Sequence, residues 1–336
     1  MSSTSVHAIG EKGAEPAALY GGQYFPIYLG TLRTDTLCKF DMYMQAKGVR
    51  SLVLYRERNL EFTEEAMQRL QENAITRLFV PSEQVQDYYH YVEDNLQDII
   101  SDSTISMEER SEVLYGSAMH LVRDILDDPR SGAVIPRSKN LVEGSIAFIF
   151  HQPAALEHLL KVSSYDYYTY THSVNVLVFS VALGKHLGYS EQAILGLGNG
   201  ALLHDIGKSM IDPAVLNFPG KLSQPQFELV KRHTIFGHAI LQHQGVKNTV
   251  MLDVARHHHE KLNGNGYPDA LSAEAISEFV RISTIADIFD ALTTRRPYKD
   301  ALTSFAALKL MRQEMQDDLD MRLFHRFVAM LGNPSH

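Results

Sequence analysis

The sequence has a single cysteine, Cys38, and no tryptophan among its 336 residues. One thiol cannot close an internal disulfide or build a thiolate cage around a metal, so a bound metal would need nitrogen and oxygen ligands. Such sparing use of cysteine fits a reducing compartment, and we expect the protein to be cytoplasmic.

Long hydrophobic runs are missing as well. The apolar stretches, of which Val174 to Leu183 is an example, are far shorter than the roughly 18 to 20 residues that span a bilayer. The N-terminal segment also lacks a basic stretch followed by an apolar one, which is the pattern of a secretory signal. We therefore expect no membrane insertion and no export.

Positive charge is in short supply. The chain has 31 Lys and Arg against 40 Asp and Glu, which gives a formal net charge of −9. A surface that binds nucleic acid needs a stripe of cations to neutralise the phosphate backbone, so we expect no nucleic-acid partner. A phosphate-bearing ligand would have to be held by a few local cations.

The length and the apolar content predict two domains, and the spacing of the apolar residues predicts a mostly α fold. We expect a disordered tail over 1–19, a small α+β regulatory or dimerisation domain over 20–98, a helical linker over 99–140 and an all-helical domain over 141–336. Strands are predicted at Phe40 to Met44, Val49 to Tyr55 and Ile75 to Val80, and helices at Glu64 to Asn73, Ser82 to Asp98 and Met107 to Asp127, the last with Ser106 as N-cap.

Histidine is abundant, with 16 residues, and several lie beside carboxylates in the C-terminal half. Five imidazoles and two carboxylates are enough for two ions if one carboxylate bridges them. Mixed nitrogen and oxygen ligation suits iron, manganese, nickel or zinc better than magnesium or calcium. The candidate ligands are His172, His204, Asp205, His233, His258, His259 and Asp287.

The predicted helix from Gln192 to Ile206 ends in a His-Asp pair, and Gly207 is expected to cap it in the left-handed conformation. Lys208 follows, where it could offset charge on a phosphoryl oxygen or protonate a leaving group. Each feature has an ordinary alternative, because capped helix ends are common and lysine is favoured near a helix C-terminus.

The other histidines of the helical region are expected to be surface or core residues without a ligand role. His257 is harder to assign, because it adjoins two candidate ligands, but one short segment does not readily aim three rings at one centre. The remainder are His151, His158, His186, His238, His243 and His325.

The candidate ligands and their neighbours, in their order along the chain, resemble the HD-GYP family of cyclic di-GMP phosphodiesterases, a branch of the HD hydrolase superfamily. The resemblance covers about 166–300. It rests on six segments, namely His172-Ser173-Val174-Asn175-Val176, Leu203-His204-Asp205-Ile206-Gly207-Lys208, His233 with Gly237, His258-His259-Glu260, Gly264-Asn265-Gly266-Tyr267-Pro268, and Ala286-Asp287-Ile288-Phe289-Asp290-Ala291-Leu292 leading into Arg296-Pro297-Tyr298-Lys299.

The resemblance implies an HD-type helical domain with a defined ligand set. The first ion would be bound by His172, His204, Asp205 and Asp287, and the second by Asp205, His233, His258 and His259. Asp205 and Lys208 would be the catalytic residues. The substrate would be held by Lys208, Gly264, Gly266, Tyr267, Pro268, Arg296 and Lys299.

Two positions depart from the pattern of the family. Some members hold a third ion with a Glu one helical turn before the first metal-binding His, but this chain has Tyr168 there, so we expect two ions. Asn263 stands where many relatives have Asp before the first loop glycine, and this change removes no ligand.

We therefore expect hydrolysis of cyclic di-GMP to pGpG, with a further step to GMP left open, by a hydroxide that bridges two metal ions. Iron and manganese are the first candidates, with nickel and zinc as alternatives. This reaction would end a bacterial second-messenger signal, and a homodimer or a diguanylate-cyclase-type partner is expected. Two alternatives stay open: the same chemistry on another cyclic dinucleotide, and a binding or partner-docking module with little turnover.

Overall fold

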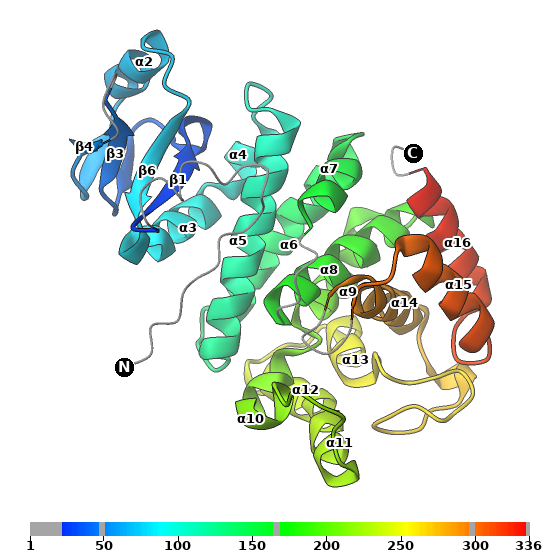
Figure 1. Ribbon diagram of the computed structural model, residues 1–336. Helices are drawn as coiled ribbons and strands as arrows, with labels where there is room; N and C mark the ends of the chain where they lie inside the picture. Colours follow the sequence, from blue (N-terminus) through cyan, green and yellow to red (C-terminus); the bar gives the residue numbers. More distant parts are fainter. Residues whose placement is uncertain (1–21, 47–50, 164–168, 296–299, 334–336) are drawn as a thin grey trace. The chain divides into compact units, whose positions relative to one another are not determined.

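The structure is a computed structural model that describes residues 22–46, 51–163, 169–295 and 300–333 (Figure 1). The predicted tail over 1–19 lies outside these residues. The chain divides into two compact units, Met1–Ser117 and Ala118–His336. The expected fold class is confirmed, since helices predominate and both small sheets lie in the first unit. The predicted boundaries after residues 98 and 140 stay predictions.

The first unit contains a four-stranded antiparallel sheet in the order β1-β6-β3-β4 and a separate two-stranded sheet. Its helices follow or interrupt the strands. The elements are β1 (Tyr24–Tyr28), β2 (Thr36–Cys38), β3 (Met42–Gln45), β4 (Leu52–Arg56), β5 (Leu60–Phe62), α2 (Glu64–Glu72), β6 (Arg77–Pro81), α3 (Val85–Asp94) and α4 (Leu96–Ser101), with short 3-10 turns at Leu29–Thr31 and Ser82–Gln84.

Aromatic side chains fill the core between the sheet and α3. The Phe40 ring meets Tyr88 and Tyr91 edge-on at 5.6 Å each, and the Phe25 ring lies 5.9 Å from Tyr89. Edge-to-face contacts at these distances are favourable beyond the area that they bury. Because α3 supplies three of these rings, it is fixed to the sheet by packing.

The sequence predictions for this unit are confirmed in part. The strands near β3, β4 and β6 and the helix α2 are present, whereas β1, β2 and β5 were not predicted. The single helix expected from Ser82 to Asp98 is wrong, because the segment forms a 3-10 turn, then α3, then α4 after Asn95. Asn95 donates its side-chain amide to the Tyr91 carbonyl at 2.8 Å, which ends α3.

The helix α5 (Met107–Asp127) has the predicted bounds and runs from the first unit into the second. Ser106 caps it as expected: its Oγ accepts the Glu109 amide at 3.2 Å, and the Glu109 carboxylate accepts the Ser106 amide at 3.2 Å. This reciprocal pair is a capping box.

The second unit is all-helical in the residues that the structure describes. After α5 it contains α6 (Val134–His151), α7 (Ala155–Val162), α8 (Thr169–His186), α9 (Glu191–Leu203), the 3-10 turn η3 (Ile206–Met210), α10 (Pro213–Leu216), α11 (Gln224–Lys231), α12 (His233–His243), α13 (Thr249–His257), the 3-10 turn η4 (Ala273–Ala275), α14 (Glu278–Thr293), α15 (Ser304–Glu314) and α16 (Met321–Gly332).

The helices α8 and α9 form the centre of this unit (Figure 1). Every residue of α8 from 171 to 184 is buried, which explains its nearly continuous apolar sequence. On one side α9 packs against α6 and α13, and on the other α8 packs against α14 and α16. Side-chain caps at Ser190, Asn248 and Ser277 begin α9, α13 and α14.

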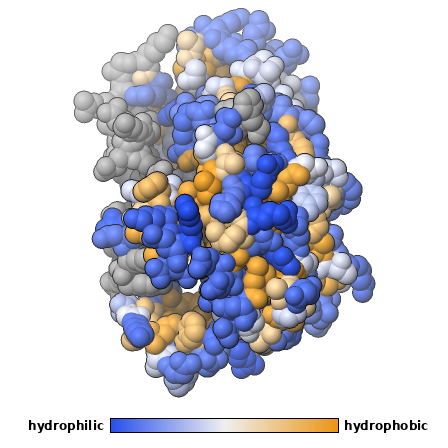
Figure 2. Space-filling view, turned by 90° about the vertical axis from the view of Figure 1, so that its right-hand side faces the viewer, coloured by the Kyte–Doolittle hydropathy of each residue, from blue (hydrophilic) through white to orange (hydrophobic). Residues whose placement is uncertain are grey.

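In the described segments, no helix combines the length and the apolar character that a bilayer crossing requires. The face shown in Figure 2 is mainly hydrophilic, with hydrophobic residues in scattered patches.

Gly207 brings η3 into contact with α12. The expected left-handed cap at this residue is wrong, because Gly207 lies within η3 and is not among the described residues with positive φ. A Cβ at this position would lie 1.9 Å from the His233 carbonyl oxygen and 2.4 Å from the Gly237 nitrogen. Only glycine allows this approach, which places the segment of Asp205 beside His233.

We predict that Gly207→Ala destabilises the protein by roughly 2 to 3 kcal/mol or more, because backbone must move to admit the methyl group. Gly132→Ala is the matched control, since nothing lies within 4 Å of its Cβ position. Urea unfolding of the two variants measures the difference, and equal midpoints would contradict the packing argument.

Candidate metal centre

The seven candidate ligands come from five places in the second unit. His172 lies near the start of α8, His204 and Asp205 follow α9, and His233 begins α12. The pair His258 and His259 follows α13, and Asp287 lies in the middle of α14. The helix packing brings these positions to one buried site.

One group of ligand atoms surrounds the Nε2 atom of His172. This atom lies 3.0 Å from Asp287 Oδ1, 3.3 Å from His204 Nε2 and 3.8 Å from Asp205 Oδ2. The ligand atoms of His172, His204 and Asp287 all lie within 4.8 Å of one another. All four residues are buried.

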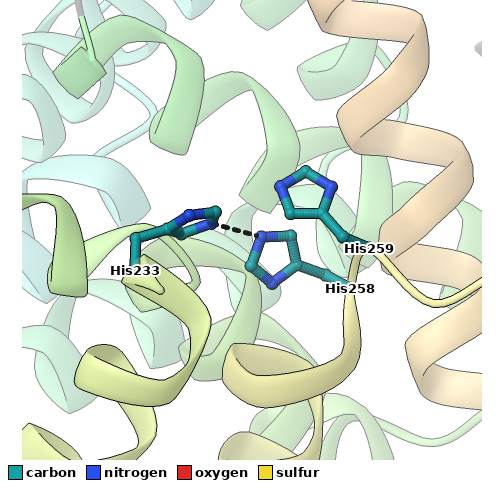
Figure 3. Close-up of side chains that lie close together, drawn as sticks. All are labelled: His233, His258 and His259. Atoms are coloured by element: carbon teal, nitrogen blue, oxygen red, sulfur yellow. Dashed lines mark hydrogen bonds between the residues drawn. The ribbon is translucent and has the colours of Figure 1, made fainter. Parts of the chain in front are cut away.

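A second group is formed by three histidines, shown in Figure 3. His233 Nε2 lies 3.2 Å from His258 Nε2, and the rings of His258 and His259 are 4.1 Å apart. The ligand atoms of the three residues lie within 4.8 Å of one another. His259 is the outermost, with 28% of its side chain exposed.

Two aspartates connect the groups. Asp205 directs Oδ2 to His204 at 3.3 Å and Oδ1 to His233 at 3.3 Å. Asp287 directs Oδ1 to His172 at 3.0 Å and Oδ2 to His259 at 3.6 Å. Asp205 therefore lies between the two groups, as a bridging carboxylate would, and Asp287 also faces both.

The histidine tautomers show that the site fits a cation. The Nδ1 atoms of His204, His233 and His258 lie 2.7, 2.7 and 3.1 Å from backbone carbonyl oxygens. A carbonyl only accepts, so each Nδ1 carries the proton and each Nε2 presents a lone pair. Two lone pairs that face each other, as in His233 and His258, need a positive ion between them.

The carboxylate of Asp205 leads to the same conclusion. Its Oδ1 is buried and has no hydrogen-bond donor among the described residues, although Oδ2 accepts from Lys208 Nζ at 2.5 Å. Burial raises the pKa of Asp205, but nearby positive charge, to which the Lys208 ammonium contributes, outweighs that effect and holds the pKa well below its usual value. An ionised buried oxygen without a donor is costly, and a metal ion would satisfy it.

Asp290 supports the first group and was not assigned a role from the sequence. Its Oδ2 accepts from His172 Nδ1 at 2.6 Å, and its Oδ1 accepts from Asn175 Nδ2 at 2.7 Å and Thr294 Oγ1 at 3.1 Å. The carboxylate fixes the His172 ring so that Nε2 faces the cluster. Asp290 lies three residues after Asp287 and therefore on the same helix face, and this spacing could have indicated its role from the sequence.

We predict that Asp290→Asn weakens metal binding by roughly 10- to 100-fold, as loss of such supporting carboxylates does. An amide cannot accept from all three donors, so its NH2 group faces one of them whichever way it turns. Asp253→Asn is the control, because Asp253 likewise accepts from a histidine, His257, at 2.6 Å, outside the cluster. Calorimetric metal titration compares the two, and equal affinities would contradict the assigned role.

The loop that carries Tyr267 is held close to the histidines. The Tyr267 ring lies 4.8 Å from the His259 ring, and the Tyr267 amide donates to the His259 carbonyl at 3.3 Å. Gly264 has φ +76°, as expected of a loop glycine. Gly266 is required for another reason, because a Cβ there would lie 2.4 Å from the Cα of Glu260.

Two carboxylates fix the ends of this loop. Buried Glu260 accepts the amides of Asp269 at 2.7 Å and Leu271 at 3.0 Å. Asp318, between α15 and α16, accepts from Lys261 Nζ at 2.7 Å and Asn263 Nδ2 at 2.5 Å. The asparagine at position 263 suits this contact, because an aspartate there would face another carboxylate.

We predict that Asn263→Asp raises hydrogen exchange of the loop amides by roughly 3- to 10-fold, the value of about one hydrogen bond. The double variant Asn263→Asp with Asp318→Asn restores a donor and an acceptor and should return exchange to the original rate. Asn265→Asp adds the same charge without facing Asp318, so Asp318→Asn should not rescue it. Failure of the first rescue would show that this contact does not hold the loop.

Acid should destabilise the metal-free protein through His233. Burial lowers the pKa of His233 from 6.5 to about 4. Between these values the unfolded chain binds the proton and the folded chain does not, so stability falls as the pH is lowered from about 6.5 to about 4. Urea midpoints across this range should fall less steeply for His233→Gln, and an unchanged slope would contradict this origin.

Four further residues discussed from the sequence are not part of the described cluster. The His257 ring nitrogens lie 2.6 Å from an Asp253 oxygen and 2.9 Å from an Asp269 oxygen, so neither is directed at the cluster. Arg296, Lys299 and the departure at Tyr168 lie outside the described residues.

Comparison with known proteins identifies the family. The chain matches the family described as HD domain over residues 155–323. A cyclic di-GMP phosphodiesterase of Pseudomonas aeruginosa is 31% identical over 279 residues, which are 79% of this chain and 67% of that protein. A 3'3'-cGAMP-specific phosphodiesterase of Vibrio cholerae is 32% identical over 246 residues, 70% of this chain and 52% of that protein.

A solved structure has the same fold. An HDG"Y"P protein from Bdellovibrio bacteriovorus aligns with a TM-score of 0.63 over 92% of this chain and 99% of that chain. At 21% sequence identity this likeness concerns the fold alone.

The helical unit and its buried His-Asp cluster define an HD-domain protein, a class that binds divalent metal ions. Among HD-domain proteins, this chain belongs to the HD-GYP family. The resemblance inferred from the six sequence segments is thereby confirmed.

Proposed function

We propose that this chain is a metal-dependent phosphodiesterase that hydrolyses cyclic di-GMP to pGpG. The main observation behind this proposal is the arrangement of the candidate ligands. The histidine Nε2 atoms face one another within two groups, and Asp205 contacts both groups. The name of the Pseudomonas aeruginosa relative supports the substrate, and 67% of that protein is covered.

In this proposal the two ligand groups hold two divalent transition-metal ions, iron or manganese first, with nickel or zinc as alternatives. His172, His204 and Asp287 would hold one ion, His233, His258 and His259 the other, and Asp205 both. When bound, such a pair supplies a nucleophile at neutral pH and offsets charge on the attacking and leaving oxygens. The nitrogen-rich donor set favours these metals over magnesium or calcium.

Lys208 acts on the substrate side of the site. Its ammonium lies against Asp205 Oδ2 and its side chain is 18% exposed, so the residue contacts both the cluster and solvent. In hydrolysis to pGpG, a water oxygen bonds to phosphorus, the bond from phosphorus to the 3' oxygen breaks, and that oxygen takes a proton. Lys208 is placed to stabilise the phosphoryl oxygen or to supply that proton.

We further propose a regulatory or dimerising role for the small α+β unit, with a homodimer or a diguanylate-cyclase-type protein as partner. Its position before the catalytic unit supports this role. Light scattering of the full chain and of a chain without residues 1–98 would test the dimer.

The direct test is turnover by the purified protein. Under reducing conditions with added ferrous or manganous ion, cyclic di-GMP should yield pGpG, and chelator should abolish the reaction. The appearance of GMP would show that hydrolysis continues. The same assay with 3'3'-cGAMP tests the other nucleotide, which the name of the Vibrio cholerae relative favours.

We predict that Asp205→Ala lowers kcat below detection, because it removes the ligand shared by both groups. Arg296→Ala, at a residue expected to bind phosphate, should instead raise KM with little change in kcat. Turnover retained by Asp205→Ala would refute the metal mechanism. Tight binding of cyclic di-GMP without product, for every metal, would favour a receptor role.

A further inference from the structure

The last residue of α11, Lys231, lies next to the loop at the candidate metal centre. Its Nζ is 5.5 Å from the centroid of the Tyr267 ring, which itself packs on His259. The same Nζ is 4.9 Å from the centroid of the Phe227 ring. An ammonium that lies over two aromatic rings is held in place by cation–π attraction.

The Lys231 charge is available to a ligand. Its side chain is 27% exposed, and its ion pair is with Glu228, which is 53% exposed, at 2.9 Å. An ammonium has three donors, and an exposed pair of this kind contributes little, so a phosphate could replace the carboxylate. By contrast, Lys208 is held by buried Asp205.

Phe227 offers an aromatic face beside this charge. It is 42% exposed, although a large apolar side chain gains from burial. It lies one helical turn before Lys231 on α11, so both side chains project from the same side of the helix. Nucleic-acid bases stack on exposed aromatic rings of this kind, often with a cation nearby.

A cyclic dinucleotide has two phosphates and two bases, and the metal centre can act on one phosphate at a time. We propose that Phe227 and Lys231 form a second subsite, which holds the half of the cyclic dinucleotide that is not being cleaved. Lys231 contacts the second phosphate, and Phe227 stacks on a purine base. This inference rests on the proposed function and names additional binding residues for it.

The subsite separates two classes of substrate. A cyclic dinucleotide uses both the metal centre and the subsite, whereas bis(p-nitrophenyl) phosphate has one phosphate and no purine. Loss of the subsite should therefore raise KM for the first substrate alone. A defect in the metal centre would affect both.

The test compares steady-state kinetics of the full chain on cyclic di-GMP and on bis(p-nitrophenyl) phosphate. Lys231→Met should raise KM for cyclic di-GMP by roughly 10- to 100-fold, the value of a charged hydrogen bond, with kcat nearly unchanged. Phe227→Ala should raise it by roughly 5- to 100-fold, and Phe227→Trp should retain the stacking. Neither change should alter hydrolysis of bis(p-nitrophenyl) phosphate.

Two controls separate binding from structure. Lys221→Met removes an exposed lysine on the loop before α11 and should leave both substrates unaffected. Glu228→Gln removes the carboxylate that competes for Lys231 and should keep or lower KM for cyclic di-GMP. If the Lys231–Glu228 pair had only a structural role, Lys231→Met and Glu228→Gln would raise KM for cyclic di-GMP to a similar extent, and the proposal would fail.

Other outcomes are equally decisive. Equal losses on both substrates in Lys231→Met would assign the residue to the metal centre, and an unchanged KM for cyclic di-GMP would exclude the subsite. If the unaltered protein cleaved bis(p-nitrophenyl) phosphate but not cyclic di-GMP, the proposed function would fall. The subsite would then be tested by calorimetric titration of cyclic di-GMP into the unaltered protein and into Lys231→Met. No binding to the unaltered protein, or equal affinity in the two proteins, would overturn the subsite.

Discussion

The structure depends on one electrostatic constraint: a buried ionised carboxylate, Asp205, surrounded by imidazole nitrogens that present lone pairs. Backbone carbonyls hold the protons of His204, His233 and His258 on the Nδ1 side, so the Nε2 atoms face inward. Without a cation among them, these buried groups would repel one another. Lys208 offsets part of the Asp205 charge from one side, and a metal ion would satisfy the lone pairs that remain.

The packing around the cluster holds its side chains and the neighbouring loop in position. Close contact at Gly207 brings the start of α12 against the segment that follows α9. Asp290 orients His172 from one side, while Glu260 and Asp318 hold the loop of Tyr267 on the other. The most exposed of the described candidate ligands is His259, next to that loop, so the cluster is open to solvent on this side.

Elements whose ends are fixed by neighbouring residues could be predicted from the sequence, whereas elements fixed by distant contacts could not. The helix α5 was predicted with its bounds, because apolar residues recur there at helical spacing and Ser106 is a favourable N-cap residue. The structure adds that Ser106 and Glu109 form a capping box. The strand β1 was not predicted, because it contains Pro26, which weakens a strand pattern and is tolerated here at a sheet edge. Gly207 was misjudged because its role is contact with α12, which is distant in the sequence.

The sequence by itself determined the helical class, the family and the residue types that could bind metal, because motif order and periodicity are local properties. Only the tertiary structure decided that Asp205 and Asp287 each face both ligand groups, and that Asp318 holds Asn263. It also placed the Lys231 ammonium over the rings of both Tyr267 and Phe227. These relations join residues from separate elements, and their distances depend on how the helices pack rather than on any spacing along the chain.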